Sequence, residues 1–501
     1  MALPLRSPAA ALGLLLLASC SGPAQEAGQQ AVRHYGDIAF KPCTLTSPYL
    51  TTNVEAQCAT LPVAEDPARP DGRKVDLNIA WLPATNEGGA TDDPVFFLAG
   101  GPGQSAVEVW PAIDGAFREV RKSRHLILVD QRGTGASNPL SCKDDEGRNA
   151  YGDEQAPGEA AAIEFARRCA ASLKADPRFY TTTDAVRDLD SVRAALGAEK
   201  INVVGASYGT RVAQQYAMRH PQHTRSVLID GVVPNELALG SEHARNLDAA
   251  LALQFQRCQA TPACRDKFGG DLREQLRSLM ARLAAAPVQT EYRDPSTGEL
   301  ASGQVTPGTV ASITRMYSYY PQGAALLPLV LNEANQGRYG SLMSLAKVLE
   351  TQMGDQFMHG MQLSVICAED ADLLQPNPDD SDTVLGNTLG DYLKVQCSAW
   401  PTGKRPADFH TPWASDLPAL LLSGELDPVT PPRYGEQIVR NLPNGRHLVL
   451  KGQGHGTFSI GCMPKLLARF LESADAKGLD AKCLDSLDYV PPFTSFNGWE
   501  P

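Results

Sequence analysis

A serine flanked by glycines is the residue of this chain best placed to do chemistry. Ser207 lies in Gly205-Ala206-Ser207-Tyr208-Gly209, directly after the apolar run 201–204 and before a segment with helical spacing. A serine hydroxyl is a poor nucleophile until a base removes its proton, so it must project from a sharp turn between a strand and a helix. Glycines on both sides relieve the crowding in such a turn. The motif therefore predicts that Ser207 is a nucleophile.

A nucleophilic serine needs a base and an orienting carboxylate, and both residue types follow it in the chain. Asp427 comes just after the apolar run 419–422, and His455 comes just after the run 447–450, between two glycines. Each has a simpler interpretation, Asp427 as a turn residue before a proline and His455 as a solvated loop residue. Loops that follow parallel strands meet at one edge of a sheet. The order and the positions therefore favour a catalytic triad of Ser207, Asp427 and His455.

Acyl transfer also requires amide groups that stabilise the negative oxygen of the tetrahedral intermediate. The main-chain amide of Tyr208, the residue after the nucleophile, is the first candidate. The second is expected in the loop 97–103, where glycines leave the amides unshielded. Gly101 is the preferred donor there and Gly100 the next choice. The alternative is that these glycines only form a tight turn.

Four motifs together resemble the proline iminopeptidase and tripeptidyl-aminopeptidase-like branch of the α/β-hydrolases. They are Gly100-Gly101-Pro102-Gly103, Asp130-Gln131-Arg132-Gly133-Thr134-Gly135-Ala136-Ser137, Gly205-Ala206-Ser207-Tyr208-Gly209-Thr210 and Asp427-Pro428-Val429-Thr430-Pro431. The resemblance implies an α/β-hydrolase fold and a serine exopeptidase that acts on peptides with a free N-terminus. It implies no metal and no cofactor. Ala99 stands where that branch often has histidine, which leaves the shape of the oxyanion loop open.

The same resemblance implies that carboxylates of a cap domain hold the ammonium group of the substrate. Glu369 and Asp370 are the expected pair, because a disulfide at the neighbouring Cys367 would fix them. An exposed acidic pair on a helix is the alternative. Asp130 and Arg132 are expected to brace the loops around the site, with a surface salt bridge as the alternative.

The elements that must position these residues alternate between strands and helices. Apolar, β-rich runs are found at 75–81, 95–98, 125–129, 201–204 and 227–229, and again at 419–422 and 447–450. This alternation predicts a mostly parallel sheet with helices on both faces. One helix is expected over 184–196, with Asp184 as its cap and Gly197 as its stop.

Helical patterns dominate from residue 239 to residue 400, and we expect an inserted, mainly helical cap there. The hydrolase core would then consist of residues 35–238 and 401–501. Turn-rich stretches such as 294–298 interrupt the cap segment.

The N-terminus has the features of a secretion signal. Arg6 precedes a short apolar core at 9–17, and Leu17-Ala18-Ser19-Cys20 resembles a bacterial lipobox. This predicts a signal peptide over 1–19, a lipid on Cys20 that attaches the chain to a membrane, and a polar tether over 20–34. The alternative is a plain secretory signal cut nearby. Both place the protein outside the cytoplasm, in the cell envelope if Cys20 is lipidated.

The remaining ten cysteines suit an oxidising compartment. Sequence alone leaves their connectivity open. Pairing each with its neighbour gives Cys43–Cys58, Cys142–Cys169, Cys258–Cys264, Cys367–Cys397 and Cys462–Cys483.

Other binding functions find little support in the sequence. The formal charge of −12, without a basic stripe, argues against nucleic acid as a partner. Zinc motifs are absent from the sequence, and Gly452-Gln453-Gly454 lacks the unit that binds dinucleotides.

Two further functions remain open. The first is a carboxylesterase, because the turn that carries the serine and the triad do not distinguish the leaving group of an ester from that of an amide. The second is a non-catalytic binding lipoprotein of the cell envelope. Haloalkane dehalogenases and epoxide hydrolases carry aspartate at the nucleophile position, where this chain has Ser207.

Overall fold

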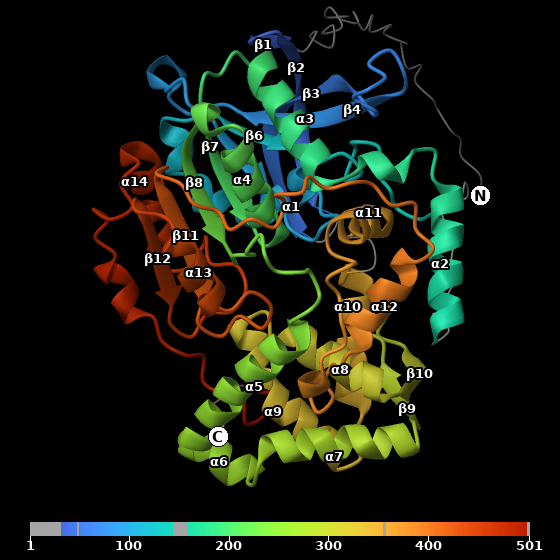
Figure 1. The fold of residues 1–501 in the computed structure, drawn as a ribbon. Helices are drawn as coiled ribbons and strands as arrows, with labels where there is room; N and C mark the ends of the chain where they lie inside the picture. The colour runs from blue at the N-terminus through green and yellow to red at the C-terminus, as the bar shows by residue number, and fades with distance from the viewer. Residues whose placement is uncertain (1–31, 48–49, 144–157, 354–356, 498–501) are drawn as a thin grey trace, which may run out of the picture.

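A computed structural model of the chain describes residues 32–47, 50–143, 158–353 and 357–497. Within these residues, a ten-stranded sheet runs through the molecule (Figure 1). In spatial order its strands are β1 (Arg33–Tyr35), β2 (Ile38–Ser47), β3 (Leu50–Ala64), β4 (Lys74–Leu82), β6 (Leu126–Val129), β5 (Val95–Leu98), β7 (Ile201–Ala206), β8 (Thr224–Asp230), β11 (Ala419–Gly424) and β12 (Gly445–Leu450).

The sheet has an antiparallel part and a parallel part. Strands β1 to β4 pair antiparallel, as do β4 and β6. The six strands from β6 to β12 are parallel. All the predicted β-rich runs are confirmed as strands. Strands β1 to β3 were not predicted. In β2, buried Ile38 and Phe40 alternate with exposed residues, which is the pattern of a strand with one solvated face.

Helices cover both faces of this sheet, as predicted. The helices on the sheet are α1 (Ala106–Ile113), α3 (Thr182–Ala195), α4 (Tyr208–Arg219), α13 (Pro432–Val439) and α14 (Met463–Ser473), whereas α2 (Glu159–Ser172) lies to one side of it (Figure 1). Val192 of α3 and Val212 of α4 belong to one buried apolar cluster. Trp110 of α1 and Phe470 of α14 belong to a second cluster. Because successive strand residues point to opposite faces, central strands such as β5, β6 and β11 contribute to both clusters.

Helix α3 begins two residues earlier than the sequence predicted, and its cap is a different residue. The side chain of Thr181 accepts a hydrogen bond from the Asp184 amide at 3.3 Å, and the Asp184 carboxylate accepts one from the Thr181 amide at 3.1 Å. This reciprocal arrangement is a capping box, so Asp184 is its third helical residue and Thr181 is the cap. Gly197 follows the helix with φ +70°, as expected of a stop.

The segment between β8 and β11 is mainly helical. It contains α5 (His243–Ala260), α6 (Pro262–Phe268), α7 (Leu272–Ala285), α8 (Pro307–Tyr317), α9 (Pro321–Asn335), α10 (Gly340–Met353), α11 (His359–Glu369) and α12 (Thr388–Cys397). The turn-rich stretch 294–298 joins an unpredicted hairpin of β9 (Val288–Arg293) and β10 (Leu300–Val305).

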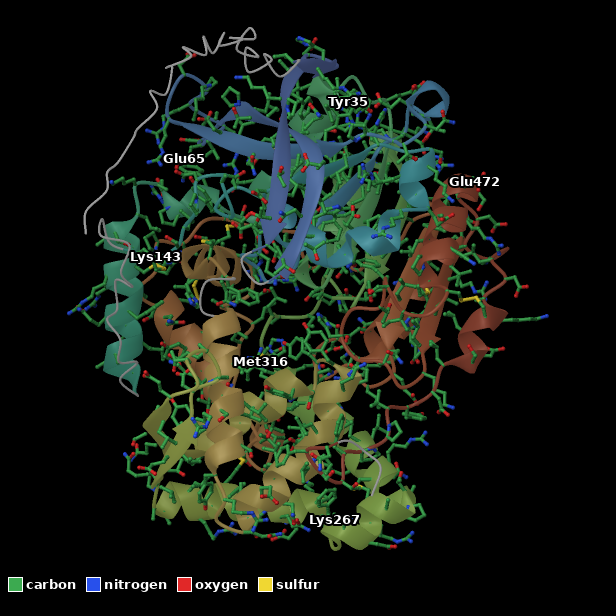
Figure 2. All side chains as sticks on the ribbon, turned by 180° about the vertical axis from the view of Figure 1, so that it is seen from behind. Tyr35, Glu65, Lys143, Lys267, Met316 and Glu472 are labelled. Atoms are coloured by element: carbon green, nitrogen blue, oxygen red, sulfur yellow. A yellow bond between two sulfur atoms is a disulfide. The ribbon has the colours of Figure 1, made fainter. Side chains whose placement is uncertain are left out.

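Most of this segment, which we call the cap, lies below the sheet in Figure 1. In Figure 2, Met316 lies nearer the sheet than Lys267, which is at the far end of the cap.

Five disulfides cross-link the described part of the chain, and they have the connectivity expected from neighbour pairing. They are Cys43–Cys58, Cys142–Cys169, Cys258–Cys264, Cys367–Cys397 and Cys462–Cys483. The predicted signal peptide, Cys20 and nearly all of the tether lie outside the described residues. Of the helices in the described ranges, none has both the length and the apolar character needed to cross a membrane.

Candidate active site

Ser207 occupies a strained turn between β7 and α4. Its φ of +54° lies in a region that residues other than glycine seldom adopt, which is typical of functional sites. The flanking glycines allow this turn. A Cβ on Gly205 would lie 2.4 Å from the Gly209 carbonyl oxygen, and one on Gly209 would lie 2.3 Å from the Leu98 carbonyl oxygen. The prediction that these glycines relieve crowding is confirmed.

The structure brings Asp427 and His455 into direct contact. Asp427 follows β11, His455 follows β12, and the carboxylate Oδ2 lies 2.8 Å from Nδ1 of the imidazole. The amides of Val429 and Thr430 each donate to Oδ1 of Asp427 at 2.8 Å. The Thr430 hydroxyl donates to Oδ2, also at 2.8 Å. Three donors therefore hold this carboxylate toward the imidazole.

The charges of these two groups stabilise each other. Burial alone would raise the pKa of Asp427, but the attraction of His455 and the hydrogen bonds to the carboxylate lower it. Burial alone would lower the pKa of His455, but the carboxylate of Asp427 raises it. Asp427 is thus held ionised, and Nδ1 of His455 keeps its proton while Nε2 can act as a base.

The imidazole lies close to the turn that carries Ser207. The Ser207 amide donates to the carbonyl of Asp230 at 2.9 Å, and a Cβ on the next residue, Gly231, would lie 2.9 Å from Cε1 of His455. Within the described residues, no hydrogen bond joins the Ser207 hydroxyl to His455. Such catalytic contacts are often long without substrate and shorten in the complex.

The loop predicted to supply oxyanion donors packs against the nucleophile. A Cβ on Gly100 would lie 3.0 Å from Cβ of Ser207. Gly101 has φ +108°, and Gly103 has φ +110°. This loop therefore needs glycine both for its conformation and for its close approach to Ser207. Tyr208 begins α4, so its amide belongs to the first turn, where helical N–H groups have no partner within the helix.

The cap is hydrogen-bonded to two of the loops around the site. The His455 amide donates to the Tyr319 carbonyl at 2.8 Å, and the Met358 amide donates to the Gly103 carbonyl at 3.0 Å. The ring of Tyr319 meets the imidazole of His455 edge to face, with 5.3 Å between centroids. The cap thus contacts both the histidine loop and the oxyanion loop.

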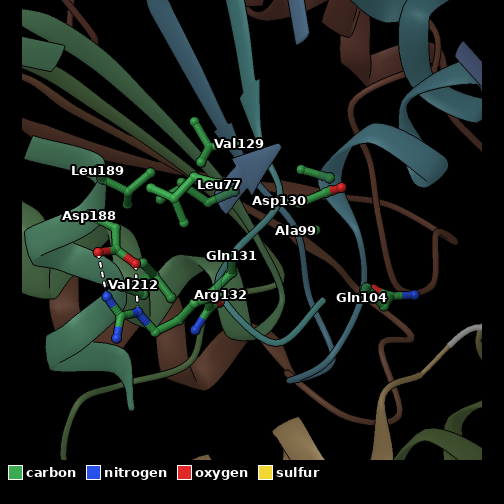
Figure 3. Close-up of a pocket in the computed structure, with 13 residues that line it drawn as sticks. Leu77, Ala99, Gln104, Val129, Asp130, Gln131, Arg132, Asp188, Leu189 and Val212 are labelled. Carbon is green, nitrogen blue, oxygen red and sulfur yellow. Dashed lines mark hydrogen bonds and ion pairs between the residues drawn. The ribbon is translucent and has the colours of Figure 1, made fainter. Parts of the chain in front are cut away.

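The motif at the end of β6 braces these loops. Asp130 accepts a hydrogen bond from the Ser105 hydroxyl at 2.6 Å, and Ser105 caps α1 directly after the oxyanion loop. Arg132 pairs with both oxygens of Asp188, at 2.6 Å and 2.7 Å (Figure 3). The alternative of a surface salt bridge is wrong, because Arg132 is only 1% exposed.

A small cavity lies between this motif and the oxyanion loop (Figure 3). Its lining includes Ala99, Gln104 and Gln131, and its volume of about 20 Å³ is enough for one water molecule. A peptide side chain does not fit there, so this cavity is not a substrate pocket.

The predicted ammonium-binding pair is fully buried, so the alternative of an exposed acidic pair is wrong. Glu369 ends α11 and accepts hydrogen bonds from the amide and hydroxyl of Thr182, at 2.6 Å and 2.9 Å. Burial and the neighbouring Asp370 raise the pKa of Glu369 to about 8. Asp370 pairs with Arg211 of the nucleophile helix at 2.9 Å. The Cys367–Cys397 disulfide adjoins the pair, as expected. The predicted contact with substrate stays a prediction.

Three residues that touch this machinery were missed from the sequence. Thr430 bonds Asp427, Thr182 lies between Glu369 and the Tyr208 hydroxyl, and Asp230 accepts hydrogen bonds from Thr457 in the histidine loop. Thr430 had a signal as part of the motif that begins at Asp427, and Asp230 had one as an acidic residue directly after the apolar run 227–229. Across the described ranges, no group of three or more His, Cys, Asp or Glu side chains is arranged to hold a metal ion.

Comparisons with known proteins match the two segments that hold this site to two family models. A family model of the alpha/beta hydrolase fold matches residues 93–297, which include Ser207. A second model, described as TAP-like protein, matches residues 383–483, which include Asp427 and His455. The chain is an α/β-hydrolase.

Relatives of this α/β-hydrolase include peptidases. Serine protease Hip1 of Mycobacterium tuberculosis is 26% identical over 497 residues, covering 89% of this chain and 91% of that protein. Tripeptidyl aminopeptidase of Streptomyces coelicolor is 23% identical over 460 residues, covering 85% of this chain and 83% of the relative. Proline iminopeptidase of Neisseria gonorrhoeae is 29% identical over 163 residues, covering 32% and 39%. The chain is a serine hydrolase that is similar in sequence to these peptidases.

Proposed function

We propose that this serine hydrolase is an exported, lipid-anchored peptidase that removes single residues or short peptides from a free N-terminus. The observation that carries the proposal is the 2.8 Å contact between His455 and Asp427, next to the strained turn of Ser207. The peptidases among its relatives support peptides as the substrate class.

In the proposed reaction, Ser207 Oγ attacks the carbonyl carbon while His455 accepts its proton. Asp427 holds the imidazole in the tautomer that leaves Nε2 free and stabilises the imidazolium. The amides of Tyr208 and Gly101 donate to the oxyanion, with Gly100 as the other candidate. The imidazolium then protonates the leaving amine, and a water molecule hydrolyses the acyl-enzyme with His455 as base.

Labelling with a fluorophosphonate tests the nucleophile. Wild type should become covalently labelled at Ser207, and Ser207→Ala should not. Ser473→Ala is the matched control, because Ser473 is an exposed serine at the end of α14. We expect Asp427→Asn to lower kcat by about 10⁴-fold, because it favours the wrong imidazole tautomer. An unlabelled wild type would favour a non-catalytic binding lipoprotein.

Substrate comparison tests the peptidase assignment. Aminoacyl and tripeptidyl amides with free N-termini should be cleaved faster than the same amides with acetylated N-termini. Simple acyl esters such as 4-nitrophenyl butyrate provide the carboxylesterase comparison. If blocked amides or esters are hydrolysed as efficiently as free-amine peptides, the aminopeptidase proposal is wrong.

Recognition of the ammonium group is proposed for Glu369 and Asp370. Among the described residues, no donor forms a hydrogen bond to Oδ1 of Asp370, although that atom is buried. Glu369→Gln keeps the shape of the side chain and removes its ability to ionise when an ammonium group binds beside it. It should raise KM for free-amine peptides while leaving ester hydrolysis unchanged. An equal effect on both substrate types would contradict the recognition role.

Lipid anchoring is proposed for Cys20. The sequence has eleven cysteines, and the five disulfides use the other ten. A bacterial host fed an alkyne fatty acid should attach it to the wild type and not to Cys20→Ala. If the wild type stays unlabelled and is released as a secreted form, a plain secretory signal is correct.

A further inference from the structure

Asp230 is a buried carboxylate beside the proposed triad to which the proposed mechanism gives no role. It is the last residue of β8, the strand between β7, which leads to Ser207, and β11, which leads to Asp427. Its exposed fraction is 2%, so its charge is stabilised by protein groups rather than by bulk water.

The backbone and the side chain of Asp230 hold different loops. Its carbonyl accepts the hydrogen bond from the Ser207 amide at 2.9 Å. Its carboxylate accepts hydrogen bonds from the Thr457 amide at 2.5 Å and from the Thr457 hydroxyl at 3.1 Å. Thr457 is fully buried and lies two residues after His455. A single residue therefore connects the turn of the nucleophile to the loop of the base.

Gly231, the residue after Asp230, lies directly against the imidazole of His455. Gly231 has φ +69°, and a Cβ there would lie 2.9 Å from Cε1 and 3.3 Å from Nδ1 of His455. The ring is thus confined between the backbone after Asp230 on one side and the ring of Tyr319 on another. Small movements of the histidine loop would change the distance that a proton must cross.

The charge of Asp230 also acts on the imidazole. Burial raises the pKa of Asp230 to about 6, against the hydrogen bonds from Thr457 and the attraction of His455. Asp230, together with Asp427, favours the protonated form of His455. His243 of α5 also interacts electrostatically with His455, and its pKa is lowered to about 3 by burial and by Arg315, so it is neutral. At neutral pH two carboxylates thus stabilise the imidazolium.

We infer that Asp230 is a positioning residue of the active site. It fixes Ser207 through its carbonyl and His455 through Thr457, and its negative charge adds to that of Asp427 at the imidazole. This inference rests on the proposed function only in that Ser207 and His455 are the nucleophile and the base.

Asp230→Asn is the direct test, because it keeps the shape of the side chain and removes its charge. Rates are measured from pH 4.5 to 9 with a free-amine alanyl amide and with 4-nitrophenyl acetate. We expect kcat/KM at pH 7.5 to fall about 10- to 100-fold on both substrates, because the base is misplaced. The acid limb of the profile should move to lower pH by about half a unit or more, because a nearby negative charge is lost. A rate within twofold of wild type, or an unmoved acid limb, would overturn the inference.

Substitutions at Thr457 keep the test decisive if Asp230→Asn fails to fold. Thr457→Val removes one donor to the carboxylate and leaves the carboxyl group in the protein, so kcat/KM at pH 7.5 should fall about 3- to 10-fold. Thr457→Ser restores the hydroxyl and should recover most of the rate. Equal rates for the valine variant and wild type would overturn the positioning role.

The two proposals fail in different ways. Loss of fluorophosphonate labelling in the wild type would reject the serine mechanism. Hydrolysis of the ester without cleavage of the peptide would reject the peptidase function, yet the effect of Asp230 would still be measured on the ester.

Discussion

The buried pair of Arg132 and Asp188 allows a quantitative prediction about stability. In addition to the carboxylate, the guanidinium donates to the carbonyls of Glu65 and Phe179, at 3.0 Å and 2.8 Å. Arg132→Met keeps most of the apolar stem and removes all of these donors. The buried Asp188 is then left without its cation, for which the expected cost is about 3–5 kcal/mol. At about 2 °C per kcal/mol for a large domain, the melting temperature should fall by about 6–10 °C.

The double variant Arg132→Met/Asp188→Leu separates the cost of an unpaired charge from the loss of the pair. It leaves no buried charge, so it should be clearly more stable than Arg132→Met alone. Arg168→Met is the matched control. Arg168 pairs with Glu164 on the exposed side of α2, and such pairs contribute little.

The pH dependence of Arg132→Met has a definite sign. Burial already raises the pKa of Asp188 against the attraction of Arg132. Without the arginine, the folded-state pKa rises further above its unfolded value. The folded state then binds the proton more tightly. The loss of stability relative to wild type should therefore be small near pH 4 and grow as the pH rises through the raised pKa. Thermal unfolding of the oxidised protein, followed by circular dichroism at pH 5 and pH 8, measures this. A fall below about 2 °C at pH 8, or a double variant less stable than the single one, would refute the reasoning.

Three other predictions concern the active site and the cross-links. Gly209→Ala should abolish fluorophosphonate labelling and lower the melting temperature, because its Cβ would lie 2.3 Å from the Leu98 carbonyl oxygen. An active, stable variant would contradict the close packing of the turn at Ser207. The acid limb of kcat/KM should have its midpoint above pH 6.5, because the carboxylate of Asp427 raises the pKa of His455 against burial; a midpoint below 6 would contradict that pairing. Removing the Cys43–Cys58 disulfide with two serines should cost about 3 kcal/mol for its loop of 15 residues without changing kcat, as thermal unfolding and an ester assay would show; a changed kcat at 20 °C would show coupling to the site.

Features that depend on short stretches of sequence could be predicted. Ser207 follows a β-rich run and lies between two glycines, and the structure places it in a strained turn after β7. Asp427 and His455 also follow apolar runs, and in the structure their side chains lie 2.8 Å apart. Parallel strands carry such loops to a common edge, so strand assignment alone brings the three together.

Features that depend on distant partners could not be predicted. Asp370 is buried because it pairs with Arg211, which is 159 residues away, and Glu369 meets Thr182 across 187 residues. An acidic pair in an acidic chain gives no sign of such partners. The sequence predicts Asp184 as the N-terminal capping residue of α3, because aspartate is common at that position. Threonine is also common there, and the structure shows that the helix begins directly after Thr181.

The bonds between the cap and the two catalytic loops involve only main-chain atoms of Tyr319, His455, Met358 and Gly103. Substituting the side chain of Tyr319 or Met358 leaves these amide and carbonyl groups in place. These two side chains can therefore vary while the hydrogen bonds that tie the cap to both loops persist.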